Sequence, residues 1–185
     1  LLTLRDVFEG VFEAAGTSLD SNVALHRQTL LGRHLWADGS RLDLPADRAE
    51  AAAAIGDFAG AAAARGFLDF CARAQRIHDA LEAPFLRAQR PSAFQFATQA
   101  GLRGLLGTSP FATLWDALGE HFADPRLRQV FARAAAYVGA SPMQAPATLM
   151  LVSHVERLGA WRVAGGMHRL AGAIESLARA RGARF

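Results

Sequence analysis

Apolar residues recur at helical spacing along most of the chain. Over residues 3–15 they fall three or four positions apart, and a glycine that suits a helix end follows. Two helix starts are explicit, because Ser109-Pro110 and Asp124-Pro125 place a capping oxygen before a proline at the first helical position. After the first helix, the pattern predicts further helices over 49–54, 58–86, 92–106, 110–122, 125–139, 146–157 and 167–181.

Between the first helix and residue 47 the period changes to two, which is typical of strands. Residues 34–37 and 41–44 flank Asp38-Gly39, a strong hairpin signal. With 23–28 they predict a three-stranded antiparallel meander, which needs a covering layer because so small a sheet is marginal alone. A short extended piece is also expected over 160–164. The predicted fold class is α+β, predominantly α-helical, with a small antiparallel sheet near the N-terminus.

Composition narrows the class of protein. The 185 residues are 51% apolar and 20% charged, which suits one sizeable core and excludes a disordered chain. A single cysteine, Cys71, excludes a disulfide-stapled secreted module. All 20 basic residues are arginines, yet the net charge is only +3, so we expect no nucleic-acid partner.

The charge is unevenly distributed along the chain. Residues 1–82 carry a net charge of −4 and residues 83–185 a net charge of +7, with no acid between Glu82 and Asp116. Arg87, Arg90 and Arg103 lie in that acid-free stretch. Two interpretations stay open: a solvated arginine-rich face, or a face that meets an anionic surface.

Patterns for unaided catalysis are missing from the sequence. No HExxH, GxSxG, Gly-rich phosphate loop or paired cysteine is present, and the histidines are scattered, so no metal site is expected. Cys71 falls on the apolar side of a predicted helix, which favours a core position. Gly165-Gly166 opens the last helix and is either a tight turn or an amide site for an anion.

Large apolar side chains gather in the second half of the chain, interleaved with arginines. One interpretation is an ordinary helical core whose rim is covered by arginine stems. The other is an apolar pocket with a mouth over 83–115 that touches a membrane. The candidate pocket residues are Phe94, Phe96, Trp115, Phe131, Met143 and Met150.

Three sequence runs form a specific combination. They are D-P-x-L-R-Q at 124–129, G-x-S-P-x-x-A-P-A-T-L at 139–149 and W-x-V-x-G-G-M-H-x-L at 161–170. Together they resemble the central region of bacterial carotenoid desaturases, in the phytoene-desaturase branch of the flavin-containing amine-oxidase-like superfamily. The hairpin sequence ADGSRLDL is a weaker match, so the resemblance covers nearly the whole chain.

The resemblance implies a flavoprotein of which this chain is a part. Residues 1–185 are expected to be a substrate-binding domain fragment, because the FAD-binding motifs that flank this region in the family are absent on both sides. The parent enzyme would use FAD to desaturate the 3,4 bond of an acyclic hydroxylated carotenoid. These 185 residues alone are expected to bind no FAD. Alternatives are a phytoene or other carotenoid desaturase, and a stand-alone helical lipid-binding or interaction module without redox activity.

The resemblance also suggests roles and partners. His168, beside the glycine pair, is expected to face the missing FAD-binding domain and join the substrate contacts, whereas no catalytic or cofactor-binding residue is assigned. Arg87, Arg90 and Arg103 are the expected membrane contacts. The parent would be cytoplasmic and peripheral to the inner or photosynthetic membrane. Apolar surface left by the missing domain leaves self-association open.

Overall fold

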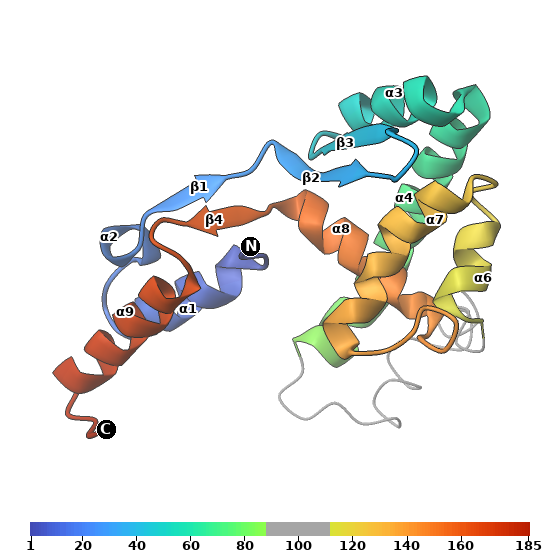
Figure 1. Ribbon diagram of the computed structural model, residues 1–185. Coiled ribbons are helices and arrows are strands. Elements are labelled where there is room, and N and C mark those ends of the chain that lie inside the picture. The colour runs from blue at the N-terminus through green and yellow to red at the C-terminus, as the bar shows by residue number, and fades with distance from the viewer. Residues whose placement is uncertain (88–111) are drawn as a thin grey trace.

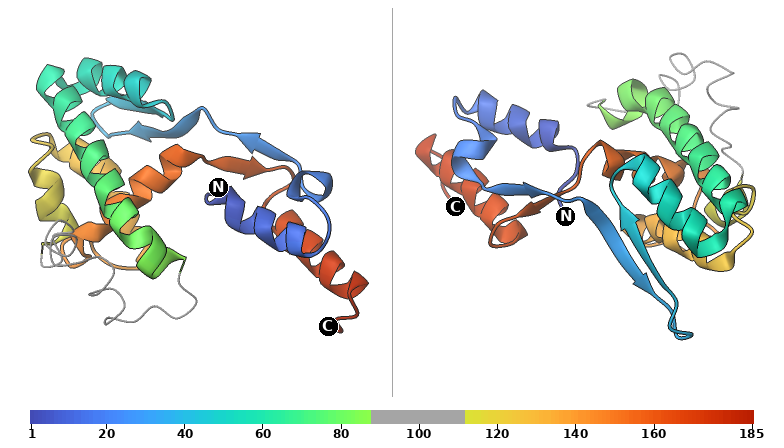
Figure 2. Two further views of the ribbon diagram at one scale, coloured as in Figure 1. Left: turned by 180° about the vertical axis from the view of Figure 1, so that it is seen from behind. Right: turned by 90° about the horizontal axis from the view of Figure 1, so that it is seen from above.

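The chain forms two lobes of unequal size, joined by two crossings of the backbone (Figure 1). The structure is a computed structural model that describes residues 1–87 and 112–185, apart from the side chains of Pro84 and Phe85. The larger lobe lies to the right in Figure 1 and the smaller to the left, and the views in Figure 2 show the same division. Each lobe has its own cluster of buried apolar side chains.

The larger lobe consists of a β-hairpin and packed helices. The hairpin is β2 (Leu30–Leu35) and β3 (Arg41–Pro45). The helices are α3 (Arg48–Ala59), α4 (Ala61–Leu81), α6 (Leu114–Gly119), α7 (Pro125–Ala132) and α8 (Leu151–Leu158). Shorter turns are the π-helical η1 (Glu82–Leu86) and the 3₁₀-helical η2 (Arg133–Val138) and η3 (Ala147–Met150).

Aromatic side chains lie at the centre of the larger core. Phe131 packs against Phe70, Phe122 and Phe67, with ring centroids 4.7, 4.9 and 5.8 Å away. All four rings are buried. Such pairs contribute about 0.5–1.5 kcal/mol each beyond the area they bury, so they hold α4 to α7 and the end of α6.

Side-chain caps fix the helix starts. Asp124 accepts a hydrogen bond from the Arg126 amide and Pro125 follows it, as predicted for α7. Thr113 caps α6, which is therefore shorter than predicted; the Ser109-Pro110 start and the helix predicted over 92–106 lie outside the described residues. The break between the first two helices of this lobe falls at Gly60, whose φ of 90° favours glycine, and not at 55–57 as predicted.

The predicted hairpin is confirmed, but the three-stranded meander is wrong. β2 and β3 pair across the Asp38-Gly39 turn, where Gly39 has a φ of 82°. β1 (Leu25–Arg27) pairs instead with β4 (Trp161–Val163), antiparallel. The Gln28 amide donates a hydrogen bond to the Ala160 carbonyl and so extends the pairing of β1 with β4. The chain then leaves β4 and enters the separate β2–β3 hairpin. Sequence reasoning missed this pairing because β4 lies far from β1 in the chain and is too short for its residue pattern to indicate a partner.

The smaller lobe packs the two ends of the chain together around the β1–β4 pair. Its helices are α1 (Arg5–Ala14), α2 (Leu19–Asn22) and α9 (Met167–Ala180). Phe12 and Leu170 bury side chains from α1 and α9 in one cluster with Val163 of β4. A predominantly helical α+β fold with small antiparallel sheets is therefore confirmed. None of the helices in the described ranges is long and apolar enough to cross a bilayer.

Candidate functional site

A cavity of about 540 Å³ opens between the link from β1 to β2, the start of α3, and helices α4 and α8. Most of the side chains around it are polar or charged. Its lining is Arg27, Gln28, Thr29, Ala46, Asp47, Arg48, Glu50, Cys71, Ala74, Gln75, Ser153, His154, Arg157 and Leu158. A cavity with such walls suits a ligand, or the end of one, that carries an oxygen function.

Arg157 is the most unusual residue of this cavity. Its guanidinium lies 4.7 Å above the Phe67 ring and donates one hydrogen bond, 3.1 Å long, to the Ala46 carbonyl. Its Nε is buried and has no hydrogen-bond partner among the residues that the structure describes. The neighbouring Glu156 pairs with Arg133, and in the described parts of the chain no carboxylate pairs with Arg157. Burial lowers the pKa of Arg157, since a guanidinium without a counter-ion is costly to desolvate.

Cys71 lies on the buried side of α4, as the sequence predicts. Burial raises the pKa of its thiol, so the thiolate is disfavoured there despite the nearby arginine. This environment suits a packing residue and not a nucleophile.

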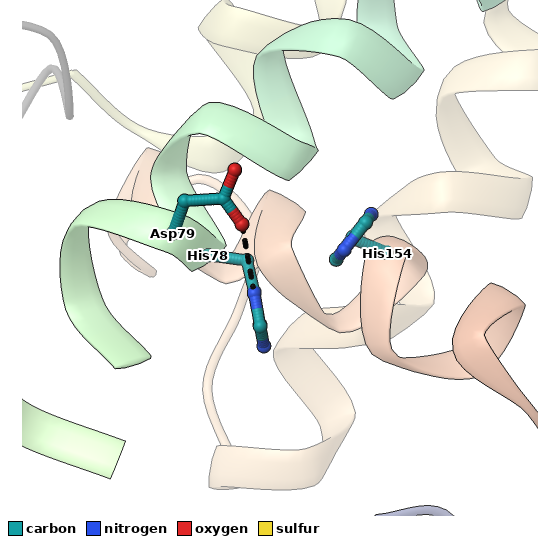
Figure 3. Close-up of side chains that lie close together, drawn as sticks. All are labelled: His78, Asp79 and His154. Carbon is teal, nitrogen blue, oxygen red and sulfur yellow. Dashed lines mark hydrogen bonds and ion pairs between the residues drawn. The ribbon is translucent and has the colours of Figure 1, made fainter. Parts of the chain in front are cut away.

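Two histidines that are far apart in sequence meet beside the cavity. His78 and Asp79 come from α4, and His154 faces them from α8 (Figure 3). The imidazole centroids of His78 and His154 are 4.8 Å apart, and His78 Nδ1 lies 3.3 Å from an Asp79 carboxylate oxygen. The sequence carries no spacing signal for this cluster, because His154 stands 75 residues beyond Asp79.

The structure brings together only some of the predicted substrate contacts. Phe131 and Met150 are buried in the larger core, and Trp115 packs against the same core with the Arg128 guanidinium 6.0 Å from its ring. Met143 and His168 are exposed, His168 at the start of α9. None of these five lines the large cavity. Phe94 and Phe96 lie outside the described residues.

The expected membrane contacts can be followed at one position only. Arg87 pairs with Asp6 of α1 and, at 3.5 Å, with Glu82. It therefore ties the end of the long helix to the smaller lobe. Arg90, Arg103 and most of the proposed mouth over 83–115 lie outside the described residues.

The smaller lobe exposes several large apolar side chains. Val7 and Val11 of α1 are each 46% exposed, as is Met167 at the start of α9. Phe185 is 74% exposed. These side chains come from α1, from the start of α9 and from the last residue, so the smaller lobe exposes apolar side chains at several places.

The chain is related to the carotenoid desaturases. No family model matches the chain. Curated relatives match it over nearly its whole length, and one of them is a phytoene dehydrogenase of Streptomyces griseus, 32% identical over 99% of this chain and 36% of that protein.

The particular relatives with higher identity are hydroxyneurosporene desaturases. The Rubrivivax gelatinosus protein is 46% identical over 98% of this chain and 35% of its own length. The Cereibacter sphaeroides protein is 44% identical over 100% of this chain and 38% of its own length. The chain is thus homologous to these desaturases and spans somewhat more than a third of their length.

Proposed function

We propose that this chain forms the substrate-side part of an FAD-dependent carotenoid desaturase in carotenoid biosynthesis, acting at the 3,4 bond of a hydroxylated acyclic carotenoid. The observation that carries the proposal is the identity of 37–46% to three proteins named hydroxyneurosporene desaturase, over nearly the entire chain. Their names give both the substrate and the reaction of those proteins, and sequence identity at this level supports a shared fold and role.

The oxidation is the chemistry that FAD supplies when it is bound. The described residues do not fit an FAD site by themselves, because the G-x-G-x-x-G turn that grips a pyrophosphate between a strand and a helix is missing from the sequence. The start of α9 is a partial exception. Gly165 and Gly166 have positive φ, and no side chain caps the helix, so its first amides are available to an anion. We assign the main FAD contacts to regions of the relatives outside the matched stretch.

The chain itself binds, orients and shields the substrate. The apolar core around Phe131 and Met150 supports the walls, while Trp115, Met143 and His168 are the predicted contacts that remain partly or fully accessible. The cavity around Arg157 is suited to the hydroxylated end of the molecule, since Arg157 and Ser153 both line it and a hydroxyl oxygen is an acceptor for a guanidinium. Placing that end there would fix which carbon–carbon bond faces the flavin.

Delivery of so apolar a substrate requires a lipid surface. We assign that contact to the segment over 83–115 with Arg87, Arg90 and Arg103, on the cytoplasmic face of the inner or photosynthetic membrane. Guanidinium groups near phosphate headgroups attract the protein to anionic lipid. The exposed apolar face of α1 and α9 supports contact with the FAD-binding domain, and self-association when that domain is lacking.

A chimaera tests the proposed function. The 185 residues replace the matched stretch of the Rubrivivax gelatinosus protein, and the product is supplied with FAD and hydroxyneurosporene. We expect a carotenoid with one more conjugated double bond, seen as a shift of absorption to longer wavelength. A chimaera lacking the stretch is the inactive control. A soluble chimaera that holds FAD and converts no carotenoid would contradict the proposal.

The second candidate is a phytoene or other carotenoid desaturase. It is supported by the Streptomyces griseus phytoene dehydrogenase, which is 32% identical. The same chimaera separates the two candidates when phytoene and hydroxyneurosporene are offered in competition. Preference for phytoene would replace the first candidate with the second.

A further inference from the structure

We propose that His78, Asp79 and His154 form a binding site for a divalent transition-metal ion such as Zn²⁺, held between α4 and α8. This site is independent of the proposed desaturase role. One ligand atom from each residue lies within 4.8 Å of the others. The three side chains approach one another from two helices, as Figure 3 shows.

The separations are near those that a metal requires. Four ligands at about 2.0–2.1 Å around a tetrahedral zinc ion stand roughly 3.3 Å apart. His78 Nδ1 and Asp79 Oδ1 are already 3.3 Å apart. The two remaining distances, from His154 to His78 and from His154 to Asp79, are at most 4.8 Å and each needs to shorten by at most roughly 1.5 Å. His154 has no hydrogen-bond partner within the described chain that would hold its ring in place, so we expect the ring to turn toward the other two ligands.

The ligand types select the metal class. Two imidazoles and one carboxylate suit zinc, cobalt and nickel, whereas calcium and magnesium prefer all-oxygen sites.

The site has a route of entry and room for a further ligand. His78 lines a second cavity, of about 340 Å³, between the two lobes, and His154 lines the larger cavity. Glu82, one helical turn beyond His78, also lines the second cavity. Three protein ligands leave a fourth position for Glu82 or water, the pattern of an exchangeable zinc site. A bound ion would join α4 to α8 beside the cavity that Arg157 lines.

Titration of the metal-free protein with Co²⁺ tests the site, because tetrahedral cobalt reports its ligands by visible absorption. We expect one ion per chain, displaced by Zn²⁺. His154→Ala and Asp79→Asn should each weaken binding by at least about tenfold, since even the loss of a supporting partner costs 10- to 100-fold. His26→Ala removes an exposed histidine on β1 and should leave binding unchanged. Cys71→Ala should do the same, although a thiolate is the strongest competing ligand nearby.

Thermal unfolding gives a second readout that does not depend on spectra. Zn²⁺ should raise the melting temperature of the unchanged protein, because a ligand stabilises only the state that binds it. The increase should be smaller in Asp79→Asn, and the melting temperature of His154→Ala should not change. Asp79 is exposed, so its amide variant preserves the fold. The proposal is overturned by the absence of saturable Co²⁺ binding, or by equal affinities for the unchanged protein, His154→Ala and Asp79→Asn. Loss of binding in Cys71→Ala would overturn it as well.

Discussion

Gly66 lies in α4 where this helix passes closest to the chain that follows α6. A Cβ atom built at Gly66 would overlap the carbonyl oxygen of His121 and stand 3.2 Å from its carbonyl carbon. Glycine in a helix interior is ordinarily worse than alanine by roughly 0.5–1 kcal/mol. Here glycine permits close contact between two backbones. We therefore expect Gly66→Ala to destabilise the protein, although helix propensity alone favours alanine.

Two opposed effects set the magnitude of the change at Gly66. Alanine gains about 1 kcal/mol in helix propensity. Overpacking costs about 1–3 kcal/mol, and the upper half of that range applies because the atom in the way is a backbone oxygen and not a flexible side chain. The free energy of unfolding should fall by about 1–2 kcal/mol. For a protein of this size the melting temperature then falls by roughly 2–8 °C.

A second glycine provides the matched control. A Cβ atom at Gly172, in the exposed face of α9, would meet no atom of the described residues within 4 Å. Gly172→Ala should therefore stabilise its helix by about 0.5–1 kcal/mol. Thermal and urea unfolding followed by circular dichroism measure both variants. If Gly66→Ala were as stable as the unchanged protein, the close approach of α4 to the His121 backbone would be refuted.

Three further predictions follow from the charged groups. Burial lowers the pKa of His34, His121 and His154 below 6.5. The unfolded chain therefore takes up protons first, and the free energy of unfolding falls as the pH drops from about 7 to 5. Urea unfolding across that pH range measures the loss. In the chimaera, Arg157→Met should change stability by less than about 1 kcal/mol, yet remove the preference for hydroxylated over unhydroxylated carotenoid in competition assays. Flotation with anionic liposomes should be lost when Arg87, Arg90 and Arg103 are replaced together by Glu.

Each of these predictions has an outcome that would count against it. A His121→Phe variant with the same acid sensitivity as the unchanged protein would show that His121 does not contribute to it. An Arg157→Met chimaera that unfolds easily but keeps its substrate preference would mark Arg157 as structural. Flotation that survives the triple replacement would move the membrane contact elsewhere.

Local signals in the sequence predicted local structure well. Asp38-Gly39 between alternating residues predicted the β2–β3 hairpin, and Asp124-Pro125 predicted the start of α7. Pairing of β1 with β4 was not predictable in this way, because strands of three residues carry too little pattern to fix a partner more than a hundred residues away. The cluster of His78 and His154 was missed for the same reason of distance.

The candidate site shows a different limit of sequence reasoning. An apolar side chain at helical spacing marks a core position and a binding wall with the same signal, and the structure places Phe131 and Met150 in the core. The polar cavity around Arg157 is assembled from three separate regions of the chain, the link from β1 to the start of α3, helix α4, and helix α8. No local pattern in the sequence marks a half-buried arginine that has no carboxylate partner among the described residues, since only packing reveals it.

The most direct measurement is the mass spectrum of carotenoids recovered from the chimaera after incubation with hydroxyneurosporene and FAD. A product lighter than the substrate by one pair of hydrogens, formed in preference to any product from phytoene, is the predicted result. Recovery of unchanged hydroxyneurosporene from a folded, FAD-loaded chimaera would contradict the assignment of this chain to the desaturation of hydroxylated carotenoids.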